Sequence, residues 1–290
     1  MAEPVRESVR ESVRVVCVTF HPGDELETFA VSLEGATSRE VDLVLVENGT
    51  DPVLAEEVAS RHGGRVVVSG ENLGYGRAAN LGAGSNTGDW LVVANPDLVW
   101  QPGSLDELLD AASRHPRAGS LGPAILNNDG TVYPSARALP SFRVGTGHAV
   151  LSRVWPGNPW TKAYLQDQET VESIEHSAGW LSGACLLLNR RAFEELGGFD
   201  EAYFMFFEDV DLGQRLGEAG WTNVYVPTAR VVHDQGVSWR DKPTTMIRAH
   251  HASAELYLHR RYHRWYHWPL RVAISGGVRA RAWLETRGTR

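Results

Sequence analysis

The sequence has little that would cross-link, export or anchor a protein. Only Cys17 and Cys185 occur, both inside apolar runs typical of strands, so two buried thiols fit them better than a disulfide or a zinc site. No apolar run reaches the roughly 18 residues that span a membrane, and the opening MAEPVRESVRESVR lacks the apolar segment of a signal peptide. We therefore expect a cytoplasmic protein. With 290 residues, 42% of them apolar and 22% charged, the chain can fold as one large α/β domain.

Positive charge is unevenly distributed along the chain. The whole sequence carries a formal net charge of −8. Residues 244–290 contain nine arginines and two glutamates, a net charge of +7, which leaves −15 for residues 1–243. A basic tail on an acidic body predicts that this end contacts a polyanionic surface, either a membrane or a nucleic acid.

Apolar runs alternate with helix-like segments through the first half of the chain. Uninterrupted apolar runs are typical of strands that are buried on both faces of a parallel sheet. The alternation therefore predicts a doubly wound α/β fold. The runs lie at 13–20, 41–47, 66–69, 90–94 and 120–126, and the helical segments include 51–61 and 104–113.

This alternation stops in the second half and then resumes. Residues 132–177 are rich in proline, glycine and tryptophan, which predicts a long excursion over the surface, and such loops are often substrate lids. Residues 1–12 have no apolar face to bury and are expected to form a flexible arm. Regular structure is expected again in the run 180–189, a helix at 191–196 stopped by Gly197 and Gly198, a helix at 209–219, a strand at 221–226 and helices near the end.

The tripeptide Asn95-Pro96-Asp97 follows the expected strand at 90–94. Ligands of open α/β sheets bind beyond the carboxyl ends of the strands, so this carboxylate is well placed to meet one. A hard divalent cation takes oxygen ligands and keeps positions for water and phosphate, so one protein carboxylate can suffice. A turn that merely ends the strand explains the same residues equally well.

Three acids follow an apolar stretch in the segment FMFFEDVD at 204–211. Asp211 precedes Arg215 by four residues, which predicts an ion pair within one helix. Asp209 has no such partner in its own helix, so it is a candidate for a metal-binding or base role. Acids also stabilise the N-terminus of a helix through its dipole, and this explains the acids without any catalytic role.

A glycine-rich segment, ENLGYGRAAN at 71–80, follows the expected strand at 66–69. Glycines would let the backbone approach a ligand, Arg77 is a candidate for a phosphate contact, and Asn72 or Asn80 for a ribose or base contact. The segment matches neither a Walker loop nor a dinucleotide-binding fingerprint. By itself it predicts a turn before a helix.

Several motifs follow one another in a characteristic order. They are VTF and ENG at the ends of the first two strands, NLGYGRAAN, NPD, the block SGACLLLNRRAFEELGGFDEAYFMFFEDVDLGQRLGEAG, and His233. This order resembles the family 2 glycosyltransferases, in particular their rhamnosyltransferase-like branch, over about 13–239, and the long block is the most specific part. The resemblance implies a GT-A fold at 13–240, which is a Rossmann-like, mostly parallel twisted sheet flanked by helices. Its nucleotide-binding half would be 13–127 and its acceptor-binding half 128–240.

The resemblance also implies roles for individual residues. It implies donor contacts from Thr19, Glu47, Asn48, Asn72, Gly74, Arg77, Asn80 and Asn95, and acceptor contacts from Trp180, Ser182 and Gly183. A divalent Mg²⁺ or Mn²⁺ would be bound by Asp97, with His233 either a second ligand or a histidine of the core. The usual family triplet begins with Asp where this sequence has Asn95, so more of the metal binding falls to Asp97 and the donor diphosphate. Asp209 matches the catalytic base of the family, with Glu208 beside it.

The implied reaction is one in-line displacement that inverts the anomeric carbon. Asp209 would accept the proton of the attacking hydroxyl while a divalent ion neutralises charge on the departing nucleoside diphosphate. The resemblance further implies dTDP-L-rhamnose as the donor and polyprenyl-diphospho-N-acetylglucosamine as the acceptor, in cell-wall polysaccharide synthesis. A different UDP- or GDP-sugar donor stays open, because specificity can depend on one contact.

The segment 241–290 combines basic and aromatic residues. Such a mixture is typical of a segment that lies at a lipid headgroup interface, so we expect the protein at the inner face of the cell membrane. A homodimer contact explains the same composition. Nucleic-acid binding by aromatic stacking is disfavoured, because the positive charge is confined to one end. The residues concerned are Tyr257, Tyr262, Trp265, Tyr266 and Trp268, with Arg260, Arg261, Arg264 and Arg271 between them.

Overall fold

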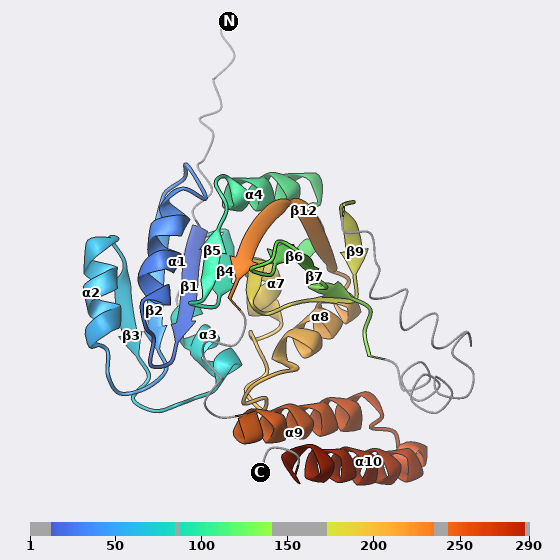
Figure 1. Cartoon of the computed structure of the whole chain (residues 1–290). Coiled ribbons are helices and arrows are strands. Elements are labelled where there is room, and N and C mark those ends of the chain that lie inside the picture. The colour runs from blue at the N-terminus through green and yellow to red at the C-terminus, as the bar shows by residue number, and fades with distance from the viewer. Residues whose placement is uncertain (1–12, 85–87, 141–172, 235–242, 288–290) are drawn as a thin grey trace, which may run out of the picture.

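A computed structural model describes residues 13–84, 88–140, 173–234 and 243–287, and it contains a central β-sheet covered by helices (Figure 1). The strands are β1 (Val13–Thr19), β2 (Val41–Glu47), β3 (Arg65–Val68), β4 (Trp90–Ala94), β5 (Leu98–Trp100), β6 (Ala118–Leu126), β7 (Val132–Tyr133), β8 (Ala136–Arg137), β9 (His176–Ala178), β10 (Trp180–Leu181), β11 (Cys185–Asn189) and β12 (Thr222–His233). The helices are α1 (Glu25–Glu34), α2 (Val53–Arg61), α3 (Tyr75–Ala83), α4 (Ser104–Arg114), α7 (Arg190–Glu195), α8 (Glu208–Glu218), α9 (Pro243–Arg261), the 3₁₀ helix η1 (Trp265–His267) and α10 (Trp268–Arg287).

The main sheet is mostly parallel, as the sequence predicts. Its strands run in the order β3-β2-β1-β4-β11-β6-β12-β5, with β7 and β9 pairing at β6 and β12. The pairs among β3, β2, β1 and β4 are parallel, as is the pair of β6 with β12. β11 is antiparallel to both neighbours, β4 and β6. All five apolar runs of the first half are strands, so the strand predictions are confirmed.

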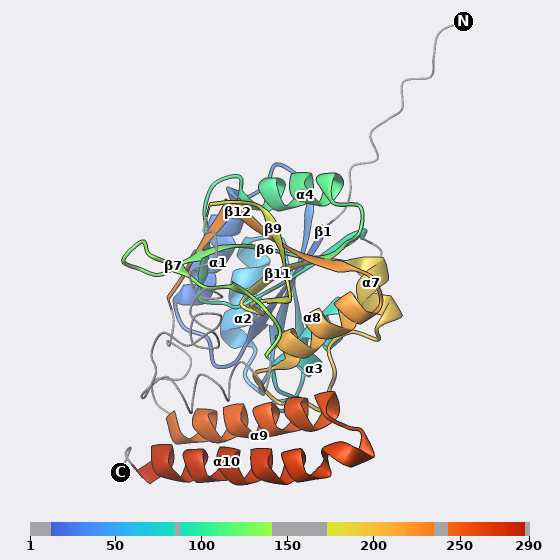
Figure 2. The ribbon, with the colours of Figure 1, turned by 90° about the vertical axis from the view of Figure 1, so that its right-hand side faces the viewer.

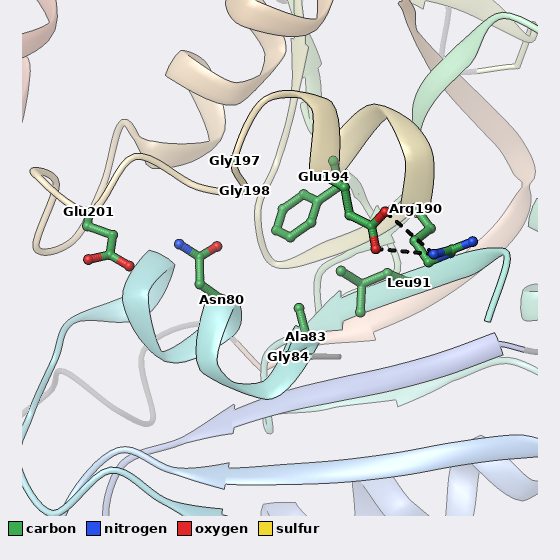
Figure 3. A pocket seen from close by; sticks show the side chains of 10 residues that line it. Asn80, Ala83, Gly84, Leu91, Arg190, Glu194, Gly197, Gly198 and Glu201 are labelled. Carbon is green, nitrogen blue, oxygen red and sulfur yellow. Dashed lines mark hydrogen bonds and ion pairs between the residues drawn. The ribbon is translucent and has the colours of Figure 1, made fainter. Parts of the chain in front are cut away.

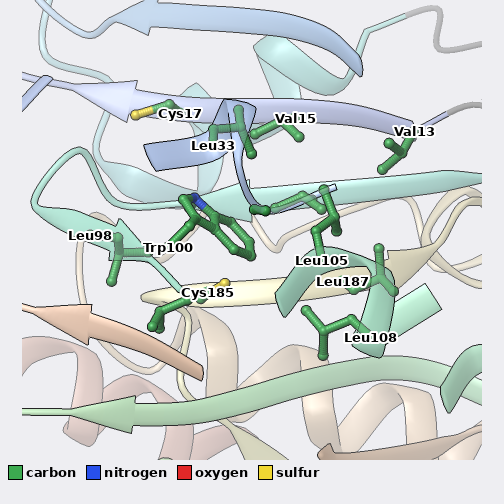
Figure 4. Packing of buried hydrophobic residues seen from close by; sticks show 14 of the residues in the cluster. Val13, Val15, Cys17, Leu33, Leu98, Trp100, Leu105, Leu108, Cys185 and Leu187 are labelled. Atoms are coloured by element: carbon green, nitrogen blue, oxygen red, sulfur yellow. The ribbon is translucent and has the colours of Figure 1, made fainter. Parts of the chain in front are cut away.

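Helices pack on both faces of this sheet because alternate residues of each strand point to opposite faces. In β1, Val15 and Cys17 pack with α1, α2 and α4, whereas Val16 and Val18 pack with α3, α7 and α8. Figure 4 shows the first cluster, in which the Trp100 ring lies among aliphatic side chains. Cys17 and Cys185 are both free and buried, as expected.

The topology gathers polar residues at one edge of the sheet. Parallel strands end at the same edge, and Thr19 at the end of β1 pairs in register with Glu47 at the end of β2. β4 leads into Asn95 and Asp97 at this edge, and β12 ends there at His233. The antiparallel β11 begins there, directly after Gly183 and Ala184.

Two long helices at the end of the chain form a layer beside the sheet domain. Figure 2 shows α9 next to the domain and α10 on its outer side. Tyr257 of α9 is buried and its hydroxyl donates to Gln214 Oε1 of α8 at 2.7 Å. Tyr257 was expected among the aromatic residues of a lipid interface, and its burial beside Val210 of α8 corrects this expectation. Within the described residues, no helix is long and apolar enough to cross a membrane.

Two expectations concern residues outside the described ranges. The expected flexible arm at 1–12 lies outside them. So does most of the expected surface excursion at 132–177, of which the structure describes only 132–140 and 173–177. The division of 13–240 into two halves remains a prediction, and the sheet is continuous across residue 127 through the pairing of β6 with β12.

Candidate active site

Asp97 and His233 meet at the carboxyl edge of the sheet. His233 Nε2 lies 3.0 Å from Asp97 Oδ1 and 3.3 Å from Asn95 Nδ2. Asp97 is 6% exposed, and the backbone N–H of Asp234 donates to its carbonyl oxygen at 3.1 Å. The structure therefore brings together three residues that lie up to 138 positions apart. Among the residues with a described position, no cluster of three or more His, Cys, Asp or Glu side chains could hold a metal ion.

Thr19 and Glu47 form a buried polar pair at the ends of β1 and β2. The Thr19 hydroxyl donates to Glu47 Oε2 at 2.7 Å, and both residues are fully buried. Glu47 Oε1 is buried and has no hydrogen-bond partner within the described part of the chain. A Cβ at Gly49 would lie 2.7 Å from this oxygen, so glycine keeps the space beside it open. A buried acceptor that lacks a partner is suited to a hydroxyl or N–H of a ligand.

Asn48 and Asn72 organise the glycine-rich segment. The Asn48 amide donates to Asn72 Oδ1 at 3.2 Å and to the Gly74 carbonyl at 3.3 Å, and Asn48 Oδ1 accepts from the Leu73 N–H at 2.9 Å. Gly74 has φ = +83°, and a Cβ there would overlap the carbonyl oxygen of Phe204. The expected turn before a helix is confirmed, since α3 begins at Tyr75.

The remaining donor candidates, Arg77 and Asn80, lie on α3. Arg77 is half-exposed, with its Nε 3.5 Å from Glu201 Oε2. Asn80 uses both ends of its amide on the backbone of Phe199, at 2.8 and 2.9 Å. It also lines a cavity of about 300 Å³ next to Arg190 and Glu194, which form an ion pair (Figure 3). Donor binding by both residues stays a prediction.

Glu208 and Asp209 begin α8, where Glu208 is buried and Asp209 is partly buried. The Asp209 carboxylate accepts hydrogen bonds from the N–H of Gly183 at 2.9 Å and of Val210 at 2.8 Å. Burial raises the pKa of Asp209 above its ordinary value, although the hydrogen bond from Gly183 opposes this shift. Burial and the adjacent Asp209 charge raise the pKa of Glu208 to about 8. A carboxylate with a raised pKa, held by backbone donors beside the carboxyl edge of the sheet, is equipped to act as a general base.

The two residues before these acids adopt strained conformations. Phe206 and Phe207 both have φ = +66°, a left-handed conformation that is unfavourable for bulky residues. Helix α9 holds this turn, because the Ser253 hydroxyl donates to the Met205 carbonyl at 2.7 Å and the His250 ring lies 5.4 Å from both phenylalanine rings. The C-terminal segment thus supports the loop that leads into the candidate base.

The predicted acceptor residues lie on the loop between β10 and β11 or next to it. The Trp180 Nε1–H donates to the Ala138 carbonyl at 3.1 Å, and Arg137 lies over the Trp180 ring. The Ser182 N–H donates to the Ser135 carbonyl at 2.8 Å, while Gly183 touches Asp209. The structure joins Gly183 to the candidate base. Acceptor binding by Trp180, Ser182 and Gly183 stays a prediction.

Asp211 has a structural role, as the sequence predicts. Its carboxylate accepts from Arg215 Nε at 2.6 Å, and Arg215 also donates to the carbonyls of Leu196 and Gly198. Asp211 thereby joins α8 to the end of α7, and the positive φ values of Gly197 and Gly198 confirm the expected helix stop.

Tyr75 and Arg137 were missed in the sequence. The Tyr75 hydroxyl donates to the Gly183 carbonyl at 2.7 Å across 108 positions, and the positive charge of Arg137 partly opposes the rise that burial causes in the pKa of Asp209. No pattern in the sequence pairs residues over such a separation, so neither role had a signal there. Only the position of Tyr75 between two glycines marks it as unusual.

The described architecture is that of the GT-A glycosyltransferases. A structure of GalNAc-T7 with UDP, GalNAc and Mn²⁺ aligns with a TM-score of 0.58 and 18% identity, covering 79% of this chain and 44% of that one. The mannosyltransferase PcManGT from Pyrobaculum calidifontis, in complex with GDP-Man and Mn²⁺, aligns with a TM-score of 0.57 and 14% identity, covering 86% and 63%. At such identities the likeness concerns the fold.

Sequence comparison defines the family. The family profile described as "Glycosyltransferase like family 2" matches residues 24–266, and the chain belongs to this family of glycosyltransferases. It is 48% identical to the N-acetylglucosaminyl-diphospho-decaprenol L-rhamnosyltransferase of Mycobacterium tuberculosis, over 95% of this chain and 93% of that protein. It is 23% identical to the rhamnosyltransferase WbbL of Escherichia coli, over 66% and 72% of the two chains. The resemblance drawn from the motifs is confirmed.

Proposed function

We propose that this enzyme transfers L-rhamnose from dTDP-L-rhamnose to polyprenyl-diphospho-N-acetylglucosamine, with inversion, in cell-wall polysaccharide synthesis. The reaction type rests on one observation above all, the Asp209 carboxylate fixed by two backbone N–H groups. The donor sugar and the acceptor are supported by the 48% identity to the mycobacterial rhamnosyltransferase.

Asp209 acts in this proposal by taking a proton from the attacking hydroxyl. Its raised pKa makes it a stronger base than an exposed aspartate, and the two N–H groups keep its orientation. Protonated Glu208 beside it would limit the repulsion between the two carboxylates, since its pKa is about 8. The hydroxyl then attacks the anomeric carbon as the bond to the diphosphate breaks, so one displacement inverts that carbon.

The residues at the sheet edge fit a divalent metal ion with a partly external ligand set. Asp97 and His233 would hold it, since the pair supplies one carboxylate and one imidazole 3.0 Å apart. Two protein ligands leave further coordination positions, which the diphosphate and water would fill. When bound, Mg²⁺ or Mn²⁺ neutralises charge on the leaving diphosphate. Asn95, in the place of the usual Asp, lies 3.3 Å from His233 and adds no charge.

Donor specificity is tested by titration calorimetry with dTDP, UDP and GDP, each with and without Mg²⁺ or Mn²⁺. We expect metal-dependent binding of dTDP at least tenfold tighter than of UDP or GDP, because the proposed nucleoside contacts Thr19, Glu47 and Asn48 are buried and one contact can decide between related donors. Preference for UDP or GDP would keep the transferase and reject rhamnose as its sugar. Failure to bind any of the three would reject the proposal.

We further propose that the outer surface of the C-terminal helices lies against the inner face of the cell membrane, where the lipid-linked acceptor is held. Trp265 is 81% exposed, Trp268 60% and Val272 63%. Arg264 is exposed beside them, whereas Arg260 and Arg261 are engaged by Asp200 and Gln214 of the domain. Exposed tryptophan with arginine suits an anionic headgroup layer.

Vesicle flotation tests this membrane contact. We expect Trp265→Ser with Trp268→Ser to lower partitioning into phosphatidylcholine–phosphatidylglycerol vesicles by roughly tenfold, because two interfacial rings are lost. The control is Val31→Ser with Val53→Ser, which removes exposed apolar side chains from α1 and α2. Equal partitioning of both variants would reject the membrane contact. Loss of a dimer in light scattering, with flotation unchanged, would assign this surface to a second subunit.

A further inference from the structure

Tyr75 lies where the nucleotide side of the site meets the candidate base. It is the first residue of α3, and its hydroxyl donates to the Gly183 carbonyl at 2.7 Å. The N–H of the same Gly183 donates to Asp209 Oδ2 at 2.9 Å. Gly183 is therefore held on one side by Tyr75 while it holds Asp209 on the other.

The close packing around Gly183 leaves little freedom for this arrangement. A Cβ at Gly183 would lie 3.2 Å from the Asp209 Cβ, so the loop and the acid are in direct contact. The Tyr75 ring packs edge-on against Phe199, with centroids 6.4 Å apart, which fixes the direction of its hydroxyl. A small displacement of Gly183 would consequently change the orientation of the carboxylate.

The backbone of the same segment is tied to both sides of the site. The Tyr75 N–H donates to the Phe204 carbonyl at 2.9 Å, in the loop that leads to Asp209. The Gly74 carbonyl accepts from the Asn48 amide at 3.3 Å, and Asn48 follows β2 beside Glu47. One short segment thus connects the candidate nucleoside contacts with the base and with its supporting loop.

We propose that Tyr75 is a positioning residue for transfer: through Gly183 it holds the Asp209 carboxylate in the orientation that accepts the acceptor proton. This inference rests on the proposed function and deepens it, because it ties the base to the donor-binding segment. Tyr75 touches neither reacting atom in this role. Its effect is expected in kcat, since a misplacement of about 1 Å in a reacting group can cost on the order of a hundredfold.

Several groups facing Asp209 contribute to the pH dependence of the rate. Glu208 lies beside it on α8, Arg137 of β8 favours its charged form, and the Tyr75 phenol stays neutral because burial and the two acids raise its pKa. The hydrogen bond from Gly183 lowers the pKa of Asp209. If Gly183 moves, this bond weakens and the pKa of Asp209 rises. Because the base must be deprotonated, the acid limb of the pH–rate profile then shifts to higher pH.

The test compares the full-length wild type with Tyr75→Phe, which keeps the ring and removes the hydroxyl. We expect kcat to fall roughly tenfold to a hundredfold, the donor KM to stay within about twofold, and the acid limb to move to higher pH. The matched control is Ser120→Ala, which removes another buried hydroxyl with a 2.7 Å hydrogen bond, to Asn223 on β12. Thermal unfolding of both variants measures the stability that each lost bond contributes.

A second measurement needs no substrate. The ¹³C titration of the Asp209 carboxyl carbon, assigned by its absence in Asp209→Asn, should show a higher pKa in Tyr75→Phe than in the wild type and in Ser120→Ala. An unchanged titration with an unchanged kcat would overturn the role of Tyr75, and a raised donor KM at constant kcat would reassign it to donor binding. A wild type that transfers no sugar would reject the proposed function, while the titration would still decide whether Tyr75 positions Asp209.

Discussion

Asp209→Asn is expected to lower the rate of sugar transfer by about a thousandfold while donor affinity stays within a few fold of the wild type. The amide keeps the shape of the side chain but cannot accept the proton of the attacking hydroxyl. Its oxygen can still accept the Gly183 N–H bond, but the bond from the Val210 N–H to the other oxygen is lost, so thermal unfolding of this variant is measured beside its kinetics. The measurements are transfer kinetics with a lipid-linked acceptor and calorimetric donor binding.

The control for this prediction is Asp110→Asn on α4. Asp110 is exposed and pairs with Arg39 at 3.5 Å, an arrangement that contributes little to stability. Its rate should equal that of the wild type. If Asp209→Asn transferred sugar at a comparable rate, another group would have to be the base, and Glu208 is the neighbouring carboxylate that a Glu208→Gln variant would examine.

Asp97→Asn is expected to abolish the metal-dependent part of donor binding and to reduce transfer at least a hundredfold. The change removes the only carboxylate among the site residues Asn95, Asp97 and His233, so a divalent ion would lose its charged protein ligand. Without the metal ion, the negative charge of the diphosphate would not be neutralised. The donor would then bind more weakly and the nucleoside diphosphate would leave more slowly. Donor titrations with Mn²⁺, and again after removal of Mn²⁺ by a chelator, measure this effect.

His233→Ala separates the two interpretations of the histidine. A ligand role predicts weaker Mn²⁺-dependent donor binding, whereas a core role predicts a lower unfolding temperature with unchanged metal dependence. For Asp97, identical donor affinities of wild type and Asp97→Asn with and without Mn²⁺ would contradict the metal site. Asp110→Asn again serves as the control, since it changes the same chemical group on the exposed face of α4.

The proposed role of Tyr75 connects the Asp209 carboxylate with the segment that is proposed to bind the donor. The proposed nucleoside contact Asn48 and the proposed base Asp209 belong to segments that are far apart in sequence, and Gly74 and Tyr75 connect them. The Asp97 substitution should affect donor binding and departure of the diphosphate, whereas the Asp209 substitution should affect proton transfer. A Tyr75 substitution should affect proton transfer alone.

Much of the fold was predictable from local sequence. The run at 13–20 is apolar without alternation, and this pattern predicted a parallel sheet. The structure shows the reason, because both faces of β1 are covered. The glycine pair at 197 and 198 predicted the end of a helix, and both residues adopt positive φ in the structure. The spacing of Asp211 and Arg215 likewise predicted their ion pair, because residues four apart share one helical face.

The sequence by itself indicated the five strands of the first half, the motifs of the family and the acids at the site, whereas the run expected at 180–189 is divided into β10 and β11 by residues 182–184. Tertiary structure alone decided which of these residues meet: Asp97 with His233, Gly183 with Asp209, Tyr75 with Gly183, and α9 with the strained turn at Phe206 and Phe207. Local patterns report the backbone conformation over a few residues. Contacts across a hundred positions depend on strand order and on the insertion of the antiparallel β11, which no local pattern encodes.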